Sequence, residues 1–318
     1  MIGYITLFII SLVLMARAGG TLVRCITRMA RFFRLSEFVV AFIVMSFATS
    51  VPEFFIGISS AVGGVPNLSL GNIIGANFLN VTLVIGIIAF LGKGIRVESK
   101  ISHQNFLLIF FLAFLPIFLA LDGIISRGDG VVLVFSFFLY IYRLVGEREY
   151  FTKIINDVAI NFKTLGGFFK SMNRFFLGVL VLVLSSALLV WTGKKLAMGI
   201  NMNLLSFGVI FMALGTALPE LVFGARASSL KHANMGIGNA LGSIAFNSLF
   251  IVGAVSLISP IAVQNNSSFF IVAIFLFSAL LLFNVFIYSR SAISRKESLV
   301  LIFLYVFFLA IEYALRVV

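Results

Sequence analysis

The feature that most constrains the fold of this chain is a series of apolar runs, each about 20 residues long, that continues from one end to the other. A helix of that length crosses the roughly 30 Å hydrocarbon layer of a bilayer. Hydrophobic residues make up 61% of the 318 residues and charged residues only 11%, too few to give a soluble protein of this size a polar surface. The chain is therefore predicted to be an all-α integral membrane protein.

The polar breaks between the apolar runs define ten membrane-spanning helices. No basic stretch precedes the first run, so it is interpreted as a span and not as a secretory signal. The segment 147–173 has no apolar periodicity and is predicted to be a cytoplasmic linker between two five-helix halves, 1–146 and 174–318. The ten helices are expected near residues 3–20, 37–62, 67–91, 105–121, 129–146, 174–194, 204–228, 234–258, 267–288 and 298–316.

The basic residues are distributed unevenly between the two sets of loops. The loops after the first, third, fifth, seventh and ninth helices hold 19 of the 23 lysines and arginines, counting those at helix ends. Because basic loops stay in the cytoplasm, both termini are predicted to face outward across a plasma membrane. The net charge of +12 is thus a signal of topology and not of nucleic-acid binding, and the lipid bilayer is an expected partner.

The chain contains an internal repeat. Residues 45–86 align without a gap with residues 212–253 at a constant offset of 167, and eleven positions are identical, including Pro, Glu and Asn inside predicted spans. Because each half has five helices, an odd number, the second copy should enter the membrane from the opposite side. Such inverted-topology repeats are typical of secondary transporters, which bind their substrate near the midplane where the repeats meet.

Two acidic residues are predicted to lie deep within a span, and they occupy equivalent positions of the two copies: Glu53 and Glu220. An isolated carboxylate at the bilayer centre costs at least ~3 kcal/mol. No lysine or arginine is expected at the same depth, so a bound cation or a proton must offset this cost. We therefore predict a cation or proton site that contains both glutamates.

The residues beside the two glutamates are suited to a hard cation. Each glutamate follows a threonine by four residues, so Thr49 and Thr216 share a helix face with it. Pro52 and Pro219 have no N–H and would each leave a backbone carbonyl without its helical donor. Carboxylate, hydroxyl and carbonyl oxygens are the ligands that calcium prefers.

Asparagines and glycines follow in the next span of each copy. Asn80 and Asn247 are expected at the depth of the glutamates and are predicted to bind the cation through their side-chain carbonyls. Asn72 and Asn239 lie about two turns away, and hydrogen bonds between helices are expected of them. The glycines form small-xxx-small faces that let helices approach closely: Gly71 and Gly75 in the first copy, Gly238 and Gly242 in the second.

The segments ATSVPE and GNIIGANFLN, with GTALPE and GNALGSIAFN, resemble the two alpha-repeats of the sodium/calcium exchanger family. The resemblance implies that Ser50 and Ser243 also line the ion site, together with the backbone carbonyls of Ser46 and Ala213. It further implies alternating access, in which the first and sixth helices slide across the other eight.

Four positions depart from the pattern of that family. Ala76, Ala217 and Ile244 replace residues with polar side chains, and Asn247 stands where prokaryotic relatives often have Asp. The site then carries a charge of at most −2, which balances one calcium or two sodium ions. A third sodium ion would add uncompensated charge in a low-dielectric site, so the departures make proton coupling more credible.

These observations predict a secondary antiporter that exchanges calcium against a monovalent cation, with sodium favoured. It is expected to be no enzyme and to need no cofactor, with calcium, sodium or protons as transported ions and inorganic cations as partners. A proton-coupled calcium or monovalent cation exchanger of the same fold is the nearer alternative. A non-transporting membrane enzyme or assembly factor is more remote, because the sequence contains no nucleophile–base arrangement, Cys/His cluster or phosphate-binding glycine loop.

Overall fold

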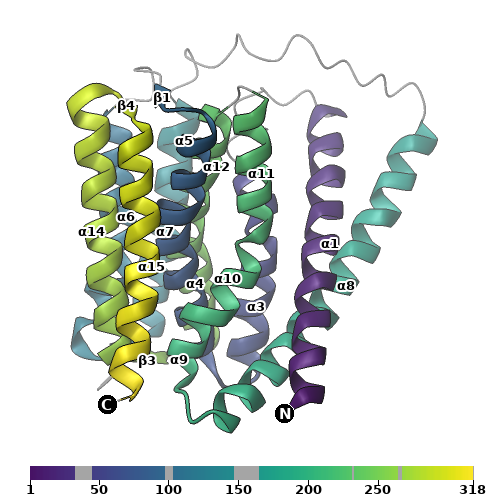
Figure 1. The fold of residues 1–318 in the computed structure, drawn as a ribbon. Helices are drawn as coiled ribbons and strands as arrows, with labels where there is room; N and C mark the ends of the chain where they lie inside the picture. Colours follow the sequence, from purple (N-terminus) through teal and green to yellow (C-terminus); the bar gives the residue numbers. More distant parts are fainter. Residues whose placement is uncertain (33–44, 97–102, 147–164, 231–232, 264–266, 318) are drawn as a thin grey trace.

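The computed structural model describes residues 1–32, 45–96, 103–146, 165–230, 233–263 and 267–317, and nearly all of them are helical. The helices run side by side between the two ends of a bundle (Figure 1). The first half comprises α1 (Ile2–Phe32), α2 (Met45–Thr49), α3 (Val51–Val62), α4 (Pro66–Leu79), the π-helix η2 (Asn80–Val84), α5 (Ile85–Leu91), β1 (Ile95–Arg96), α6 (His103–Leu119), the 3-10 turn η3 (Ala120–Asp122), β2 (Ile124–Ile125) and α7 (Arg127–Gly146).

The second half follows the same order with small differences. It comprises α8 (Leu165–Gly199), α9 (Leu204–Phe207), the π-helix η5 (Gly208–Met212), α10 (Ala213–Thr216), α11 (Leu218–Ser229), α12 (Ala233–Ala245), the π-helix η6 (Phe246–Ile251), α13 (Val252–Ile258), β3 (Ile261–Ala262), α14 (Ser267–Arg290), β4 (Ala292–Ile293) and α15 (Arg295–Val317). The start of α1 and the end of α15 lie at the same end of the bundle (Figure 1).

Several of these helices are long and apolar enough to cross a bilayer by themselves. Within the described ranges there are four: Pro66–Leu91, Asn173–Gly199, Ala233–Ile258 and Ser267–Arg290. A fifth span is possible if Leu204–Thr216 and Leu218–Ser229, which meet at a bend of 42°, are counted together. The chain is therefore a multi-pass helical membrane protein.

Two of the long helices form the centre of the bundle. The four spans differ in the buried share of an apolar 18-residue window. This share is 83% in Pro66–Leu91 and 78% in Ala233–Ile258, but only 39% in Asn173–Gly199 and in Ser267–Arg290. The central helices are the ones that carry the predicted asparagines, so the polar residues of both copies are enclosed by protein rather than facing lipid.

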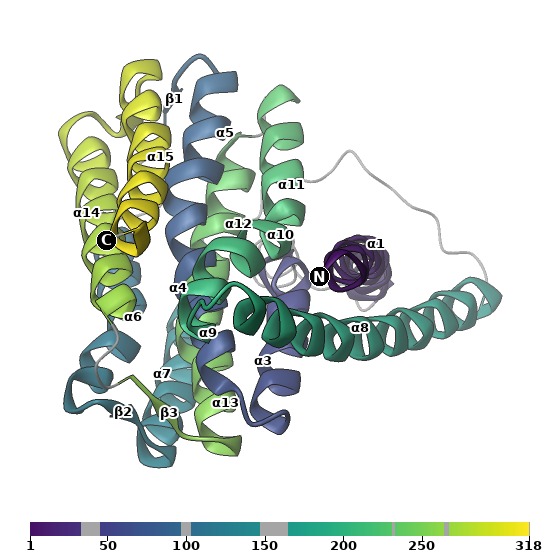
Figure 2. The ribbon, with the colours of Figure 1, turned by 60° about the horizontal axis from the view of Figure 1, so that its bottom comes forward.

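Helices α1 and α8 stand to one side of the other helices and pack against each other (Figures 1 and 2). They share a separate hydrophobic core that includes Met15 of α1 and Leu182 and Leu189 of α8. The same cluster includes buried residues of the other helices, such as Ile56 of α3, Leu68 of α4 and Phe207 of α9. It therefore packs α1 and α8 against each other and against the rest of the bundle.

Two short antiparallel β pairs join the two halves at opposite ends of the bundle. Ile95 of β1 pairs with Ile293 of β4, and Ile125 of β2 pairs with Ile261 of β3. The repeat offset of 167 carries β1 and β2 to within one residue of β3 and β4, respectively, so the same symmetry operation exchanges the two pairs. These strands are two residues long and lie in connections between helices, which explains why apolar periodicity does not reveal them.

Two helices differ in length from the sequence prediction. The first extends to Phe32 rather than residue 20, and α8 begins at Leu165 rather than near residue 174, inside the predicted linker. The extension of α1 contains Arg, Met and Ala, and that of α8 contains Leu, Lys and Met, all good helix formers, so each helix extends beyond its apolar run. The rest of the predicted linker, and the first part of the predicted helix 37–62, lie outside the described residues.

Candidate functional site

Both copies of the repeat contain a helix that is interrupted at the same point. One residue separates α2 from α3 and α10 from α11, and the two residues have nearly the same backbone angles: φ −87° and ψ 7° at Ser50, φ −79° and ψ 0° at Ala217. Pro52 and Pro219 follow within the first turn of the new helix, where the missing N–H costs least. Each proline thus follows a one-residue interruption of its helix, and in the second copy the helix bends there by 42°.

The two breaks place Glu53 and Glu220 in the first turns of α3 and α11. Each glutamate is only 1% exposed. The Thr216 side chain lies close to the carboxyl of Glu53, and the Thr49 side chain lies close to that of Glu220. The two carboxyls are also close enough to interact electrostatically. Residues 167 positions apart in the sequence therefore meet in one polar centre.

The threonines connect the repeats in a symmetric way. The Thr49 hydroxyl donates to Oδ1 of Asn239 at 3.2 Å, and the Thr216 hydroxyl donates to Oδ1 of Asn72 at 3.1 Å. The Thr49 hydroxyl is also 3.3 Å from that of Ser243. The expected interhelical hydrogen bonds of Asn72 and Asn239 are thus confirmed, each to the opposite copy of the repeat.

Five buried oxygen atoms of the predicted ligand residues have no hydrogen-bond partner among the described residues. They are Oε2 of Glu53 and of Glu220, Oδ1 of Asn80 and of Asn247, and Oγ of Ser50. A buried acceptor without a donor costs roughly 1–3 kcal/mol, so a cluster of them is unfavourable unless something else is bound. Among side-chain atoms, these oxygens are the ones a bound cation would satisfy.

Two of the three π-helices in the described ranges begin at or beside the two asparagines. The first, η2, starts at Asn80, and η6 starts at Phe246, directly before Asn247. A π-turn shifts the register of a helix by one residue, and such turns are frequent at functional sites. Their positions at equivalent points of the two copies could not be inferred from the sequence, because π-turns leave no distinct pattern of residue types.

The backbone carbonyls of Ser46 and Ala213 already accept hydrogen bonds in this conformation. The Ser46 carbonyl accepts from the Ser50 N–H at 3.1 Å and from the Thr49 hydroxyl at 3.4 Å. The Ala213 carbonyl accepts from the Ala217 N–H at 3.0 Å and from the Thr216 hydroxyl at 3.4 Å. Cation binding by these two carbonyls would therefore have to displace the threonine hydroxyls, and their role as ligands stays a prediction.

Glycines bring the central helices of the two halves into contact. A Cβ atom at Gly71 would lie 2.0 Å from the Leu205 carbonyl oxygen, and one at Gly75 would lie 2.6 Å from that of Val209. The predicted close approach is thus confirmed for the first copy, where it sets α4 beside α9, η5 and α10. The repeat offset carries Leu205 and Val209 onto residues 38 and 42, so the corresponding approach to Gly238 and Gly242 lies outside the described part of the chain.

One residue of the centre is absent from the sequence prediction. Nδ2 of Asn77 donates to the Ser248 hydroxyl at 2.8 Å, and its Oδ1 accepts from Nδ2 of Asn247 at 3.1 Å. Asn77 therefore holds Asn247 with Oδ1 free. The repeat partner of Asn77 is Ile244, so a search for residues shared by both copies passes over it.

Comparison with known proteins identifies the family. The family model for the sodium/calcium exchanger protein matches residues 3–146 and 170–314. The chain belongs to the sodium/calcium exchanger family. Its members are transporters and not enzymes, so the predictions of family and of a non-enzymatic role are confirmed. The two matched segments nearly coincide with the halves 1–146 and 174–318 expected from the repeat.

Relatives resemble the chain along its whole length. An uncharacterized membrane protein of Methanocaldococcus jannaschii is 28% identical, and the alignment covers 97% of this chain and 97% of the relative. The sodium/calcium exchanger MaX1 of Methanosarcina acetivorans is 25% identical, with 96% of this chain and 97% of the relative covered. A solved structure of the sodium-calcium exchanger NCX_Mj, soaked with Na⁺ and Sr²⁺, is 26% identical with a TM-score of 0.67, covering 97% of this chain and 98% of the other.

Proposed function

We propose that the chain exchanges calcium against sodium at one polar centre formed by Glu53 and Glu220. The observation that carries this proposal is the meeting of two buried carboxyls from different halves, surrounded by oxygen atoms without hydrogen-bond donors. Two carboxylates match the charge of one calcium ion or two sodium ions. The family and the sodium/calcium exchangers among the relatives support the same pair of ions.

The proposed ligands come from both repeats. Calcium takes six to eight oxygen ligands, and the centre offers carboxylate, hydroxyl and amide oxygens in about that number. They are Glu53, Glu220, Asn80, Asn247, Thr49, Thr216, Ser50 and Ser243, with the carbonyls of Ser46 and Ala213 as further candidates. Within the part of the chain that the structure describes, Nδ2 of Asn72 and of Asn239 also has no hydrogen-bond partner, which favours water molecules beside the ion.

Exchange rather than leak follows from the use of one site by both ions. Calcium and sodium need the same two carboxylates, so each excludes the other, and the site must release one ion before it accepts the next. We propose that α1 and α8 move together against the remaining helices to expose the site alternately to the two sides. The hydrophobic cluster that α1 and α8 share is distinct from the main core of the bundle, which supports such a motion.

We further propose ten spans arranged as two inverted five-helix repeats, with both termini outside a plasma membrane and the segment 147–173 inside. Three features support this topology: both termini lie at one end of the bundle (Figure 1), the two β pairs are exchanged by the repeat symmetry, and the threonine–asparagine bonds are reciprocal. Basic residues in the loops opposite the termini set the orientation.

Calcium flux into proteoliposomes tests the proposed function. An outward sodium gradient should drive calcium uptake, and an equal potassium gradient should not. A proton-coupled exchanger is the second candidate, favoured by Asn247 and Ala217, which leave the centre without a third acid and without one hydroxyl. Uptake driven by a pH gradient without sodium would support that candidate and overturn sodium coupling.

A further inference from the structure

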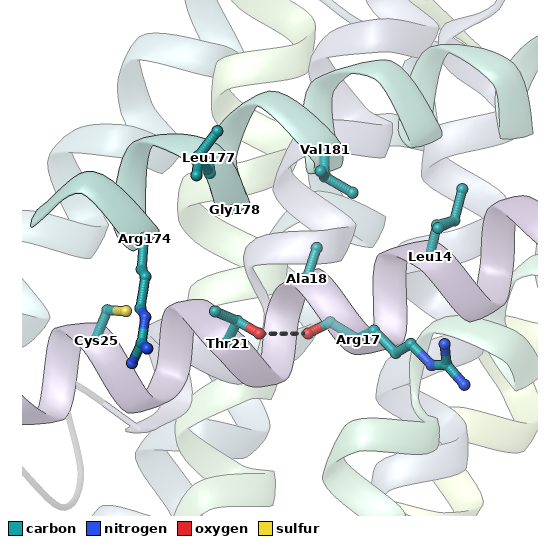
Figure 3. A pocket seen from close by; sticks show the side chains of 9 residues that line it. All are labelled: Leu14, Arg17, Ala18, Thr21, Cys25, Arg174, Leu177, Gly178 and Val181. Carbon is teal, nitrogen blue, oxygen red and sulfur yellow. Dashed lines mark hydrogen bonds between the residues drawn. The ribbon is translucent and has the colours of Figure 1, made fainter. Parts of the chain in front are cut away.

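A groove separate from the polar centre lies between α1 and α8 and has a volume of about 520 Å³ (Figure 3). Its walls combine apolar side chains with two arginines. It is lined by Leu14, Arg17, Ala18, Thr21, Cys25, Arg174, Leu177, Gly178 and Val181. Nine residues therefore form a mixed apolar and cationic surface without a single acid.

The two arginines lie at the ends of the apolar parts of their helices. The apolar run of α1 covers Ile2–Ala18, and that of α8 covers Asn173–Gly199. Arg17 and Arg174 are thus placed where both helices leave the hydrocarbon layer, on the side that carries most of the basic loops. Phosphate groups of lipids occupy this depth in a bilayer.

The arginines have no anionic partner in the described parts of the chain. Both side chains are exposed, and neither guanidinium forms an ion pair there. Figure 3 shows the Arg174 side chain reaching from α8 toward α1, near Thr21 and Cys25, while Arg17 extends along α1 at the other end of the groove. Guanidinium groups are well suited to phosphate because their donors match its oxygens.

We propose that this groove binds the headgroup of an anionic phospholipid of the cytoplasmic leaflet. The phosphate lies beside Arg174, Arg17 adds positive charge at the other end of the groove, and the acyl chains pack on Leu14, Leu177 and Val181. Basic pockets between membrane helices on the cytoplasmic side are suited to such headgroups. A lipid in this position contacts both α1 and α8 and none of the residues of the polar centre.

Lipid binding to the purified chain tests this site. Retention of phosphatidylglycerol is measured by native mass spectrometry for the wild type, for R17Q/R174Q and for the control R290Q/K296Q, which removes two exposed charges that do not line the groove. Arg174 should contribute about 5-fold through the phosphate and Arg17 adds to the attraction, so R17Q/R174Q should bind the lipid at least about 5-fold more weakly. The control should retain wild-type binding.

Two further measurements separate a lipid site from alternatives. Phosphatidylcholine has the same phosphate, but its choline cation offsets the charge, so it should bind the wild type more weakly than phosphatidylglycerol and lose less affinity in R17Q/R174Q. Glycerol phosphate or inorganic phosphate should fail to displace phosphatidylglycerol, because neither provides acyl chains; full displacement would identify a site for soluble phosphate and overturn the lipid assignment. Equal binding of phosphatidylglycerol to R17Q/R174Q and to the control would also overturn it.

Discussion

The two copies of the repeat agree in some residues of the polar centre and differ in others. Both supply a glutamate, a threonine and an asparagine at equivalent positions, and both interrupt a helix before a proline. They differ in the neutral residues: Ser50 aligns with Ala217, and Asn77 aligns with Ile244. The shared residues thus set the charge and frame of the site, whereas the differing residues give its two sides distinct sets of oxygens.

The largest expected effect comes from the residues that the copies share. E53Q and E220Q should each lower sodium-dependent calcium uptake by about 100-fold or more, because each removes half of the charge that balances the ion. Uptake into proteoliposomes measures this. The matched control is E312Q, since Glu312 is likewise buried, at 2% exposure, but accepts a hydrogen bond from Ser268 at 2.9 Å and lies outside the centre. Wild-type uptake by either E53Q or E220Q would contradict the claim that both carboxylates balance the charge of the ion.

The contact between the copies is sensitive to added volume. G71A should lower the free energy of unfolding by roughly 1–3 kcal/mol, because its Cβ would meet the Leu205 carbonyl, which belongs to the backbone and cannot move aside easily. Thermal unfolding in detergent measures the change. G3A is the control, because nothing lies within 4 Å of a Cβ at that position. Equal stability of the two variants would show that α4 and α9 do not pack as closely as described.

The differing hydroxyl should have a smaller effect. S50A should weaken calcium binding by about 5-fold, the net value of one neutral oxygen ligand, since the Ser50 hydroxyl has no partner within the described chain. A217S gives the second copy the serine that the first copy has at the equivalent position, and it should tighten calcium binding by a similar factor. Equilibrium binding of radioactive calcium measures both. Unchanged binding in S50A would place this hydroxyl outside the ion's ligand shell.

The smallest expected effect is on the orientation of Asn247. N77I copies the second repeat into the first and removes the amide that holds Asn247, so calcium binding should weaken by about 3-fold. I244N adds an amide to the other copy and serves as the control for volume and polarity. A wild-type affinity in N77I would mean that Asn247 keeps its orientation without Asn77.

The sequence alone predicts the residues that the two copies share and the departures at Ala217 and Ile244, but it misses Asn77. Pro, Glu, Thr and Asn stand out against apolar neighbours, so Glu53, Thr49 and their repeat partners could be identified by alignment of the chain with itself. Asn77 could not, because its repeat partner is apolar. The π-turns and the short β pairs depend on contacts between the halves, which no local pattern encodes. The extensions of α1 and α8 could not be predicted, because hydropathy shows where a chain crosses the bilayer but does not show where the helix ends.

The most direct test of the shared site is calcium binding to the purified chain while sodium is increased. We predict that at most one calcium ion binds per chain, that sodium displaces it competitively and completely, and that E53Q and E220Q both remove it. Calcium that stays bound at saturating sodium, or that binds normally without either carboxylate, would contradict a single centre made by both repeats.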